Sequence, residues 1–337
     1  MSLLQRSFRS FSTSSTNRIV NSVGISSSPG HNNLVALLGS RTTSKNAAWL
    51  QPFAALSQSL VTLTKLSETV QDPQPLDEHV RVISLNRPAS KNAISVSLLD
   101  QLEGSIRKLK EEDRVSKVRA VLLRSTVPGA FCAGADLKER KTMSLAEVDE
   151  FLQKLRSVFT QLSNLPMPFL VCLDGLAMGG GLELALTADL RIAGPKADKL
   201  GLTETRLGII PGAGGTTRMT RLIGASKSKE LIFTARLLDS RQAQSMGFVE
   251  ILAETDSSAS KGQEAFEKGV ELARAISKNG PLAVRAAKMA IDRGSKMEGE
   301  TSLDYERQCY EMIINTEDRL EGLKSFSEKR QPIYQGK

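Results

Sequence analysis

Two glutamates beside a run of glycines are the residues of this sequence whose types and spacing could do chemistry. Gly179, Gly180 and Gly181 follow an apolar segment and precede a helical pattern, so another group can approach the bare backbone and its N–H donors closely. A helix that begins there adds unpaired N–H groups and the positive end of its dipole. Such donors stabilise negative charge that develops on a carbonyl oxygen. Glu183 lies in the first turn of this helix, and Glu204 follows 21 residues later.

Two more glycine-rich segments lie on either side of this one. Residues 127–138 read VPGAFCAGADLK, and residues 210–215 read IPGAGG. Nucleotide-binding motifs do not fit the downstream glycines. Residues 212–217 lack the third glycine of a dinucleotide fingerprint, and residues 224–228 are too short for a phosphate loop. A redox or nucleotide-hydrolysing function therefore receives little support.

The composition limits which residues can move protons. The sequence holds two histidines, His31 and His79, and three cysteines without a CxxC pair, Cys132, Cys172 and Cys309. These are too few for a Ser-His-Asp triad or a multi-histidine metal site, so no metal is expected. The odd cysteine count argues against a disulfide framework. In an enzyme, carboxylates must then carry the proton chemistry.

The three glycine segments, in this order and at nearly these spacings, resemble the crotonase (enoyl-CoA hydratase/isomerase) superfamily. The resemblance covers the chain from His79 onward and is nearest to the mitochondrial branch that contains enoyl-CoA hydratase and 3-methylglutaconyl-CoA hydratase. It implies an α/β crotonase (ClpP-like) fold of repeated ββα units with a helical C-terminal trimerisation region. The implied reaction is hydration of a short-chain enoyl-CoA or 3-methylglutaconyl-CoA to the 3-hydroxyacyl-CoA. Coenzyme A would be part of the substrate, with no other cofactor, and the chain would form homotrimers or hexamers.

The resemblance also implies roles for individual residues. Glu183 would activate water and Glu204 would protonate C2. The N–H groups of Ala135 and Gly180 would bind the thioester oxygen, and the N–H of Gly212 would help to hold the water. The residues that would contact coenzyme A, the last two in a neighbouring subunit, are Ala93, Asp136, Leu137, Lys138, Phe326 and Lys329.

Two departures from the family pattern concern Glu204. The two glutamates are one residue further apart than is usual in the family, with an apparent insertion in residues 194–200. Thr203 replaces the common Pro or Val before the second glutamate. The insertion could displace Glu204, which would alter rate and specificity more than the class of reaction.

Alternatives remain open at three points. A Δ3-Δ2 enoyl-CoA isomerase typically manages with a single acidic residue, whereas both glutamates are present here. The methylglutaconyl branch also binds AU-rich RNA, but its lysine positions on the first core helix read Val96, Asp100 and Gly104, so RNA binding is not expected. For the acyl group, Arg140 and Arg206 are candidates to bind a free carboxylate, and a straight short chain fits as well.

The N-terminal segment differs in charge from the rest of the chain. Residues 1–67 contain six basic and no acidic residues, which leaves 39 basic against 37 acidic residues in the remainder. Apolar side chains near the N-terminus share one helical face, with Arg6 and Arg9 opposite, which is typical of a mitochondrial transit peptide. A plastid transit peptide is the alternative to matrix targeting, and no apolar span suits a membrane helix. We therefore expect a leader over residues 1–67, a core over 73–256 and a helical region over 257–337.

Apolar periodicity and turn residues outline the elements of the core. Strands are expected over residues 80–85, 118–123, 169–173 and 248–252. Helices are expected over residues 98–109, 144–162, 182–188, 227–234 and 240–246. Three or four helical segments should follow, with breaks at residues 279–281 and at Gly294.

Overall fold

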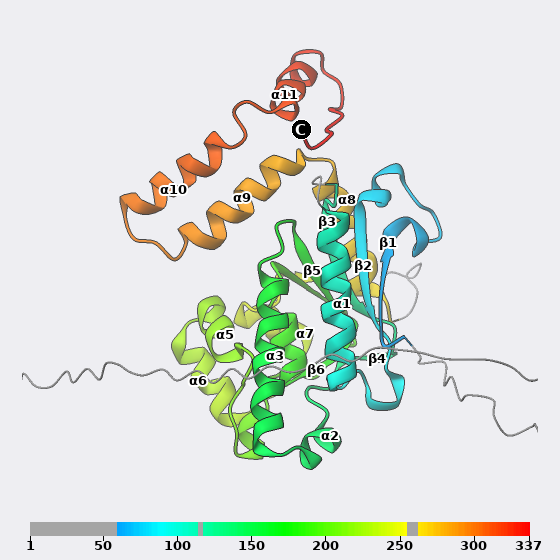
Figure 1. Cartoon of the computed structure of the whole chain (residues 1–337), viewed down its shortest axis with the longest axis vertical. Helices are drawn as coiled ribbons and strands as arrows, with labels where there is room; N and C mark the ends of the chain where they lie inside the picture. The colour runs from blue at the N-terminus through cyan, green and yellow to red at the C-terminus, as the bar shows by residue number, and fades with distance from the viewer. Residues whose placement is uncertain (1–58, 114–116, 255–261) are drawn as a thin grey trace, which may run out of the picture. The chain divides into compact units, whose positions relative to one another are not determined.

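The computed structural model describes residues 59–113, 117–254 and 262–337, in which strands and helices alternate along the chain (Figure 1). Most of the expected leader lies outside these residues. Its last part does not, because strand β1 (Val61–Lys65) pairs antiparallel with β2 (Val80–Leu85). Residues 61–65, which we expected in the leader, are therefore part of a sheet.

The larger sheet has six strands in the order β1-β2-β3-β5-β7-β9. Apart from β1 and β2, neighbouring strands are parallel, with Val82 opposite Leu122 and Leu122 opposite Leu170. Parallel strands covered on both faces read as continuous apolar runs, as β5 does, and every residue of β5 is buried. The strands beyond β2 are β3 (Ala120–Ser125), β5 (Phe169–Leu173), β7 (Leu190–Ala193) and β9 (Ile251–Leu252).

A second, parallel sheet consists of three short strands in the order β4-β6-β8. They are β4 (Gly129–Cys132), β6 (Gly175–Met178) and β8 (Leu200–Gly201). Each follows a strand of the larger sheet along the chain and precedes a helix, which is the repeated ββα unit that the sequence resemblance implied. The strand that leads into the glycine run is thus β6, whereas the sequence pointed to β5. We missed β6 because it has only four residues and includes Gly175 and Ala177.

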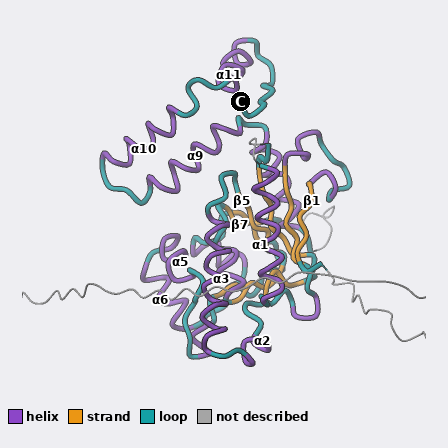
Figure 2. The backbone as a smooth tube through the Cα atoms, viewed as in Figure 1, coloured by secondary structure: helices purple, strands orange, loops and turns teal. Residues whose placement is uncertain are grey.

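Helices cover both faces of the larger sheet (Figure 2). On β3, Val121 and Leu123 share a buried cluster with α1 (Val96–Glu112) and α3 (Leu145–Ser163). Ala120 and Leu122 lie in a second cluster with α8 (Glu264–Ser277), as the alternation of side chains along a strand requires. The other helices before α8 are α2 (Leu137–Thr142), α4 (Gly180–Ala185), α5 (Gly215–Ile223), α6 (Ala225–Thr234) and α7 (Ser240–Met246).

Three helices follow α8, and the predicted breaks at residues 279–281 and at Gly294 bound the first of them, whereas the break between the second and the third was not predicted. They are α9 (Pro281–Gly294), α10 (Glu300–Glu311) and α11 (Glu317–Ser327). Ion pairs of Arg285 with Asp113 and of Lys288 with Asp189 join α9 to the core. Among the described helices, none is long and apolar enough to cross a membrane.

Candidate active site

The glycine run after β6 packs against the loop that follows β4. Gly179 has φ 51° and ψ −125°, which only glycine adopts easily, and it turns the chain from β6 into α4. A Cβ atom on Gly134 would lie 2.8 Å from the carbonyl oxygen of Met178, so the two segments leave no room for a side chain. A Cβ atom on Gly180 would lie 3.6 Å from the nitrogen of Ala135. The two N–H groups that we expected to act together are therefore neighbours.

Both of these N–H groups are available as donors. Within the described parts of the chain, neither Ala135 nor Gly180 donates its N–H to another protein group. Gly180 is the first residue of α4, where N–H groups have no partner inside the helix. Next to Ala135, the backbone bonds to Ile94 are made by Gly134 and Asp136 instead. Two adjacent free donors can bind one carbonyl oxygen and stabilise negative charge on it.

Glu183 is only 2% exposed on α4, and residues 212–215 hold its carboxylate. Its Oε1 accepts hydrogen bonds from the N–H groups of Ala213 and Gly215, both at 2.8 Å. Burial raises the pKa of Glu183, while these donors and the charge of Arg218 act in the opposite direction. We expected a role for Gly212, but the structure adds its neighbours Ala213 and Gly215. A side chain at Gly215 would displace the carboxylate, because a Cβ atom there would lie 2.9 Å from Oε1 of Glu183.

Glu204 begins a 3-10 helix, η4 (Glu204–Leu207), and is 9% exposed. Its Oε1 would lie 3.2 Å from a Cβ atom on Gly179, so the carboxyl adjoins the start of α4. Its Oε2 is buried and has no hydrogen-bond partner among the described residues. Burial and, secondly, the charge of Glu183 raise the pKa of Glu204 to about 7. The structure thus brings both predicted glutamates together in different environments.

The segment in which the resemblance indicated an insertion before Glu204 forms a turn. In residues 194–199 the N–H of Ala197 donates to the carbonyl of Gly194 at 3.1 Å, and β8 follows. Pairing of β8 with β6, with Gly201 opposite Met178, then fixes the chain a few residues before the glutamate. Glu204 therefore adjoins Gly179 in spite of the longer spacing.

Four residues expected to contact coenzyme A lie in two segments that pair with each other. The N–H of Ile94 donates to the carbonyl of Gly134 at 2.7 Å, and the N–H of Asp136 donates to the carbonyl of Ile94 at 3.0 Å. This pairing places Ala93 beside residues 135–138. Ala93 is buried, whereas Leu137 and Lys138 are exposed.

Arg87 joins these two segments, and we did not predict it. Its Nη1 donates to the carbonyl of Ala93 and to Oδ2 of Asp136, both at 2.7 Å. Asp136 also accepts from the N–H of Lys138 and caps α2, so its carboxylate shapes the loop. No sequence pattern marks Arg87, because the carboxylate that its guanidinium binds lies 49 residues further along the chain.

Phe326 and Lys329 do not join the other predicted residues within one copy of the chain. Phe326 is 87% exposed on α11. In Figure 1, α11 and α2 lie at opposite ends of the described core. The resemblance placed their contact with coenzyme A in a neighbouring subunit.

The two arginines considered for a substrate carboxylate are both engaged within the protein. Arg140 stacks on Phe151, with its guanidinium carbon 5.1 Å from the ring centroid. Arg206 donates to the carbonyl of Ala235 at 2.7 Å.

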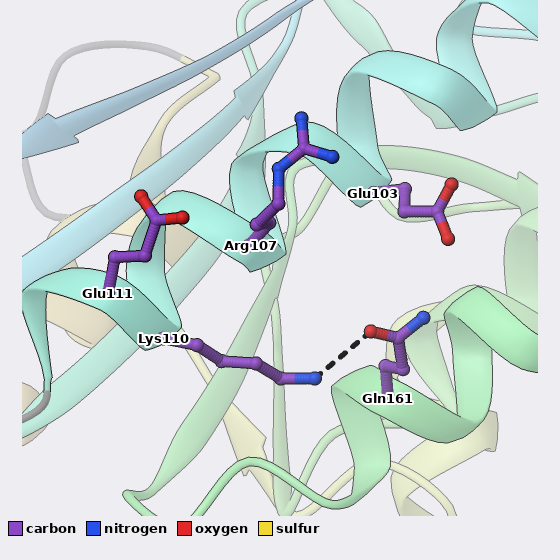
Figure 3. A pocket seen from close by; sticks show the side chains of 5 residues that line it. All are labelled: Glu103, Arg107, Lys110, Glu111 and Gln161. Atoms are coloured by element: carbon purple, nitrogen blue, oxygen red, sulfur yellow. Dashed lines mark hydrogen bonds between the residues drawn. The ribbon is translucent and has the colours of Figure 1, made fainter.

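A hollow of about 450 Å³ lies between α1 and α3 (Figure 3). Lys110 and Gln161 are hydrogen-bonded across it at 3.0 Å. None of the predicted site residues lines this hollow, and charges of both signs lie side by side on α1. It belongs neither to the candidate active site nor to a basic stripe. Its lining side chains are Glu103, Arg107, Lys110, Glu111 and Gln161.

Known proteins are similar to this chain in both sequence and fold. A family model described as enoyl-CoA hydratase/isomerase matches residues 76–337. The methylglutaconyl-CoA hydratase, mitochondrial, of Mus musculus is 48% identical over 255 residues, which is 76% of this chain and 79% of that one. The probable enoyl-CoA hydratase 2, mitochondrial, of Arabidopsis thaliana is 46% identical over 260 residues, 77% of this chain and 83% of that one. A crystal structure of enoyl-CoA hydratase from Bacillus anthracis matches with a TM-score of 0.74 and 41% identity, covering 82% of this chain and 100% of that one.

Proposed function

This chain belongs to the enoyl-CoA hydratase/isomerase family, and we propose that it hydrates an α,β-unsaturated acyl-CoA thioester to the 3-hydroxyacyl-CoA. The match to a solved relative confirms the predicted crotonase fold with its C-terminal helices. One observation carries the proposal. Glu183 and Glu204 are buried in different environments beside the free N–H groups of Ala135 and Gly180. The reaction needs no cofactor besides the coenzyme A of the substrate.

A group in the protein can then be assigned to the developing negative charge and to each of the two proton transfers of the hydration. The thioester oxygen accepts hydrogen bonds from Ala135 and Gly180, which stabilise the enolate-like charge that forms as water adds to C3. Each such donor contributes roughly 3 kcal/mol in comparable oxyanion holes. Glu183 takes a proton from water as the water oxygen bonds to C3, and Glu204 gives its proton to C2. One water is added, and the two carboxyls exchange their protonation states.

The environments of the two carboxyls support this division of roles. Ionised Glu183 accepts two backbone N–H bonds, which favour the charged form that a base needs. Oε2 of Glu204 has no such donor in the described chain, and the nearby charge of Glu183 favours its protonated form. Burial raises the pKa of both carboxyls, but the N–H donors to Glu183 offset this rise, whereas the charge of Glu183 adds to it at Glu204. This difference suits the pair to serve as base and acid at one pH.

The activity should depend on pH through this pair. Hydration requires Glu204 to be protonated, and its pKa of about 7 means that kcat/KM should fall as the pH rises above about 7. It should also fall in acid, as Glu183 gains a proton and can no longer accept one from water. A pH profile of kcat/KM measures both limbs. The two apparent pKa values that it gives belong to the coupled pair of carboxyls. A rate that stays level well above neutrality would contradict the role of Glu204 as the acid.

A direct assay decides which acyl group the substrate carries. The relatives named above are called methylglutaconyl-CoA hydratase and enoyl-CoA hydratase, which supports a branched or a straight short chain. Hydration of crotonyl-CoA and of 3-methylglutaconyl-CoA should be compared, with the gain of one water followed by mass spectrometry. Turnover of neither, together with isomerisation of a Δ3-enoyl-CoA, would refute the hydratase proposal.

We also propose that the chain assembles as a trimer or a hexamer. Apolar side chains are exposed along the C-terminal helices, and such surfaces are usually covered by a partner. Sedimentation or light scattering should therefore find trimers or hexamers, with monomers inactive because the family resemblance assigns Phe326 to the ligand of a neighbouring subunit. A stable, fully active monomer would contradict this. The exposed residues include Leu303, Tyr310, Leu320, Leu323 and Phe326.

A mitochondrial location is the last part of the proposal. The two relatives described above carry the word mitochondrial in their names, and residues 1–58 have the acid-free composition of a transit peptide. We propose that the leader is removed in the matrix. N-terminal sequencing of the protein from its own cells tests this, since an intact leader in organelle fractions would refute it.

A further inference from the structure

Arg156 on α3 reaches the segment that holds Glu183. Its Nε donates a hydrogen bond to the carbonyl oxygen of Gly212 at 2.6 Å, across 56 residues of sequence. The same helix contacts this glycine a second time, because a Cβ atom on Gly212 would lie 3.1 Å from Cδ2 of Leu152. The proposed reaction so far gives Arg156 no task.

The carbonyl bound by Arg156 and the N–H bound by Glu183 belong to one peptide group. The C=O of Gly212 accepts from Arg156, and the N–H of Ala213 donates to Oε1 of Glu183 at 2.8 Å. In a planar trans peptide these bonds point in opposite directions, so Arg156 and Glu183 lie on opposite sides of the segment. A guanidinium donor forms a charge-assisted bond, and hydrogen bonds in a chain strengthen one another.

We propose that Arg156 is a positioning residue for the hydration: it fixes the plane of the Gly212–Ala213 peptide and, through it, the carboxylate of Glu183. This inference rests on the proposed function, in which Glu183 is the base. Without Arg156 the N–H of Ala213 becomes a weaker and less well aimed donor. The ionised form of Glu183 is then less stabilised, which raises its pKa. The carboxylate oxygen also turns away from the water that it should deprotonate.

The fold does not depend on Arg156. Its side chain is exposed, and exposed polar contacts contribute little to stability. Arg218 donates to the next carbonyl, that of Ala213, at 2.7 Å, so the segment keeps a second support. Buried side chains anchor α3 in the core: Phe151, Leu155, Val158, Phe159 and Leu162.

Two substitutions of matched shape separate the hydrogen bond from the bulk of the side chain. Arg156→Met keeps the length of the side chain up to the place of Nε but has no donor there. Arg156→Gln places a neutral N–H donor at that point. We expect Arg156→Met to lower kcat about tenfold with little change in KM, in keeping with the net worth of one hydrogen bond. Arg156→Gln should recover most of that loss.

A pH profile and a double substitution test whether the effect passes through Glu183. In Arg156→Met the acid limb of kcat/KM should move to higher pH, because the pKa of the base rises. In the background of Glu183→Gln, Arg156→Met should have no further effect on kcat, since neighbours that act as one unit are not additive. Arg221→Met, which removes an exposed charge from α5, is the matched control and should keep normal kcat.

The outcomes separate this inference from the proposed function. If Glu183→Gln is slow but Arg156→Met has normal kcat and an unshifted profile, Arg156 is not a positioning residue and Glu183 remains the base. The same conclusion follows if Arg156→Met slows the Glu183→Gln enzyme as much as the parent. If Glu183→Gln is fully active, the proposed function itself fails. Melting temperatures of all variants should lie close to that of the parent.

Discussion

Replacing Glu183 or Glu204 by glutamine will lower kcat for hydration by about 10²–10⁴-fold and leave KM nearly unchanged. Glutamine has almost the shape of glutamate and keeps a hydrogen-bonding end, so the thioester should still bind. It can neither take a proton from water nor give one to C2. The loss should therefore appear in the transition state alone. The double substitution should cost less than the product of the two, because both carboxyls act in the same addition of water to one thioester.

The electrostatic coupling of the pair supplies a second readout. The charge of Glu183 helps to raise the pKa of Glu204, so Glu183→Gln should move the alkaline limb of the remaining activity to lower pH. Glu204→Gln should remove that limb altogether. Glu264→Gln is the control, because Glu264 is also a buried glutamate but lies on α8 and should keep full activity. Near-normal hydration by Glu204→Gln would instead favour a single-carboxylate reaction such as that of the isomerases.

The parts of the site that sequence could predict are those in which a residue type follows from a local backbone requirement. Gly134 and Gly179 have positive φ, and a Cβ atom on Gly215 would lie 2.9 Å from the carboxylate of Glu183, so glycine is strongly favoured at these positions. Runs of glycine therefore mark the site in the sequence itself. The glutamates could be predicted because the composition leaves few other groups for proton chemistry, and because the glycine segments around them resemble those of a family.

The parts that sequence could not predict depend on long-range contacts. Arg87 meets Asp136 across 49 residues, and Arg156 meets Gly212 across 56 residues. A single arginine forms no sequence pattern from which its hydrogen-bond partner could be inferred. Ala213 was missed for a related reason, since its contribution is a backbone N–H that any residue possesses.

The fold shows the same division between local and distant information. Long apolar runs such as β5 and amphipathic helices such as α3 were predicted closely, because their periods extend over many residues. The short strands of the second sheet were not, since β8 has only two residues and β6 contains Gly175 and Ala177. Their existence follows from pairing with one another, which a single stretch of sequence does not reveal. These are the strands that place Gly180 beside Ala135.

Substituting Gly134 by alanine will lower kcat about 10²–10³-fold, the loss expected when one donor of an oxyanion hole is misplaced. The new Cβ would lie 2.8 Å from the carbonyl oxygen of Met178, which is backbone and cannot turn aside. The two segments must therefore move apart, and with them the N–H groups of Ala135 and Gly180. A thioester oxygen can then accept a good hydrogen bond from only one of them.

Gly129→Ala provides the matched control for this prediction. Gly129 has φ 71° and Gly134 has φ 94°, so alanine is strained by about 1–2 kcal/mol at either position. No atom lies within 4 Å of a Cβ on Gly129, however, so that variant should melt at a lower temperature yet keep nearly normal kcat. Equal kcat values for the two variants would show that the approach of Gly134 to Met178 is not what holds the two donors together. A large difference in kcat at similar melting temperatures would separate the clash from the strain, because the strain is common to both.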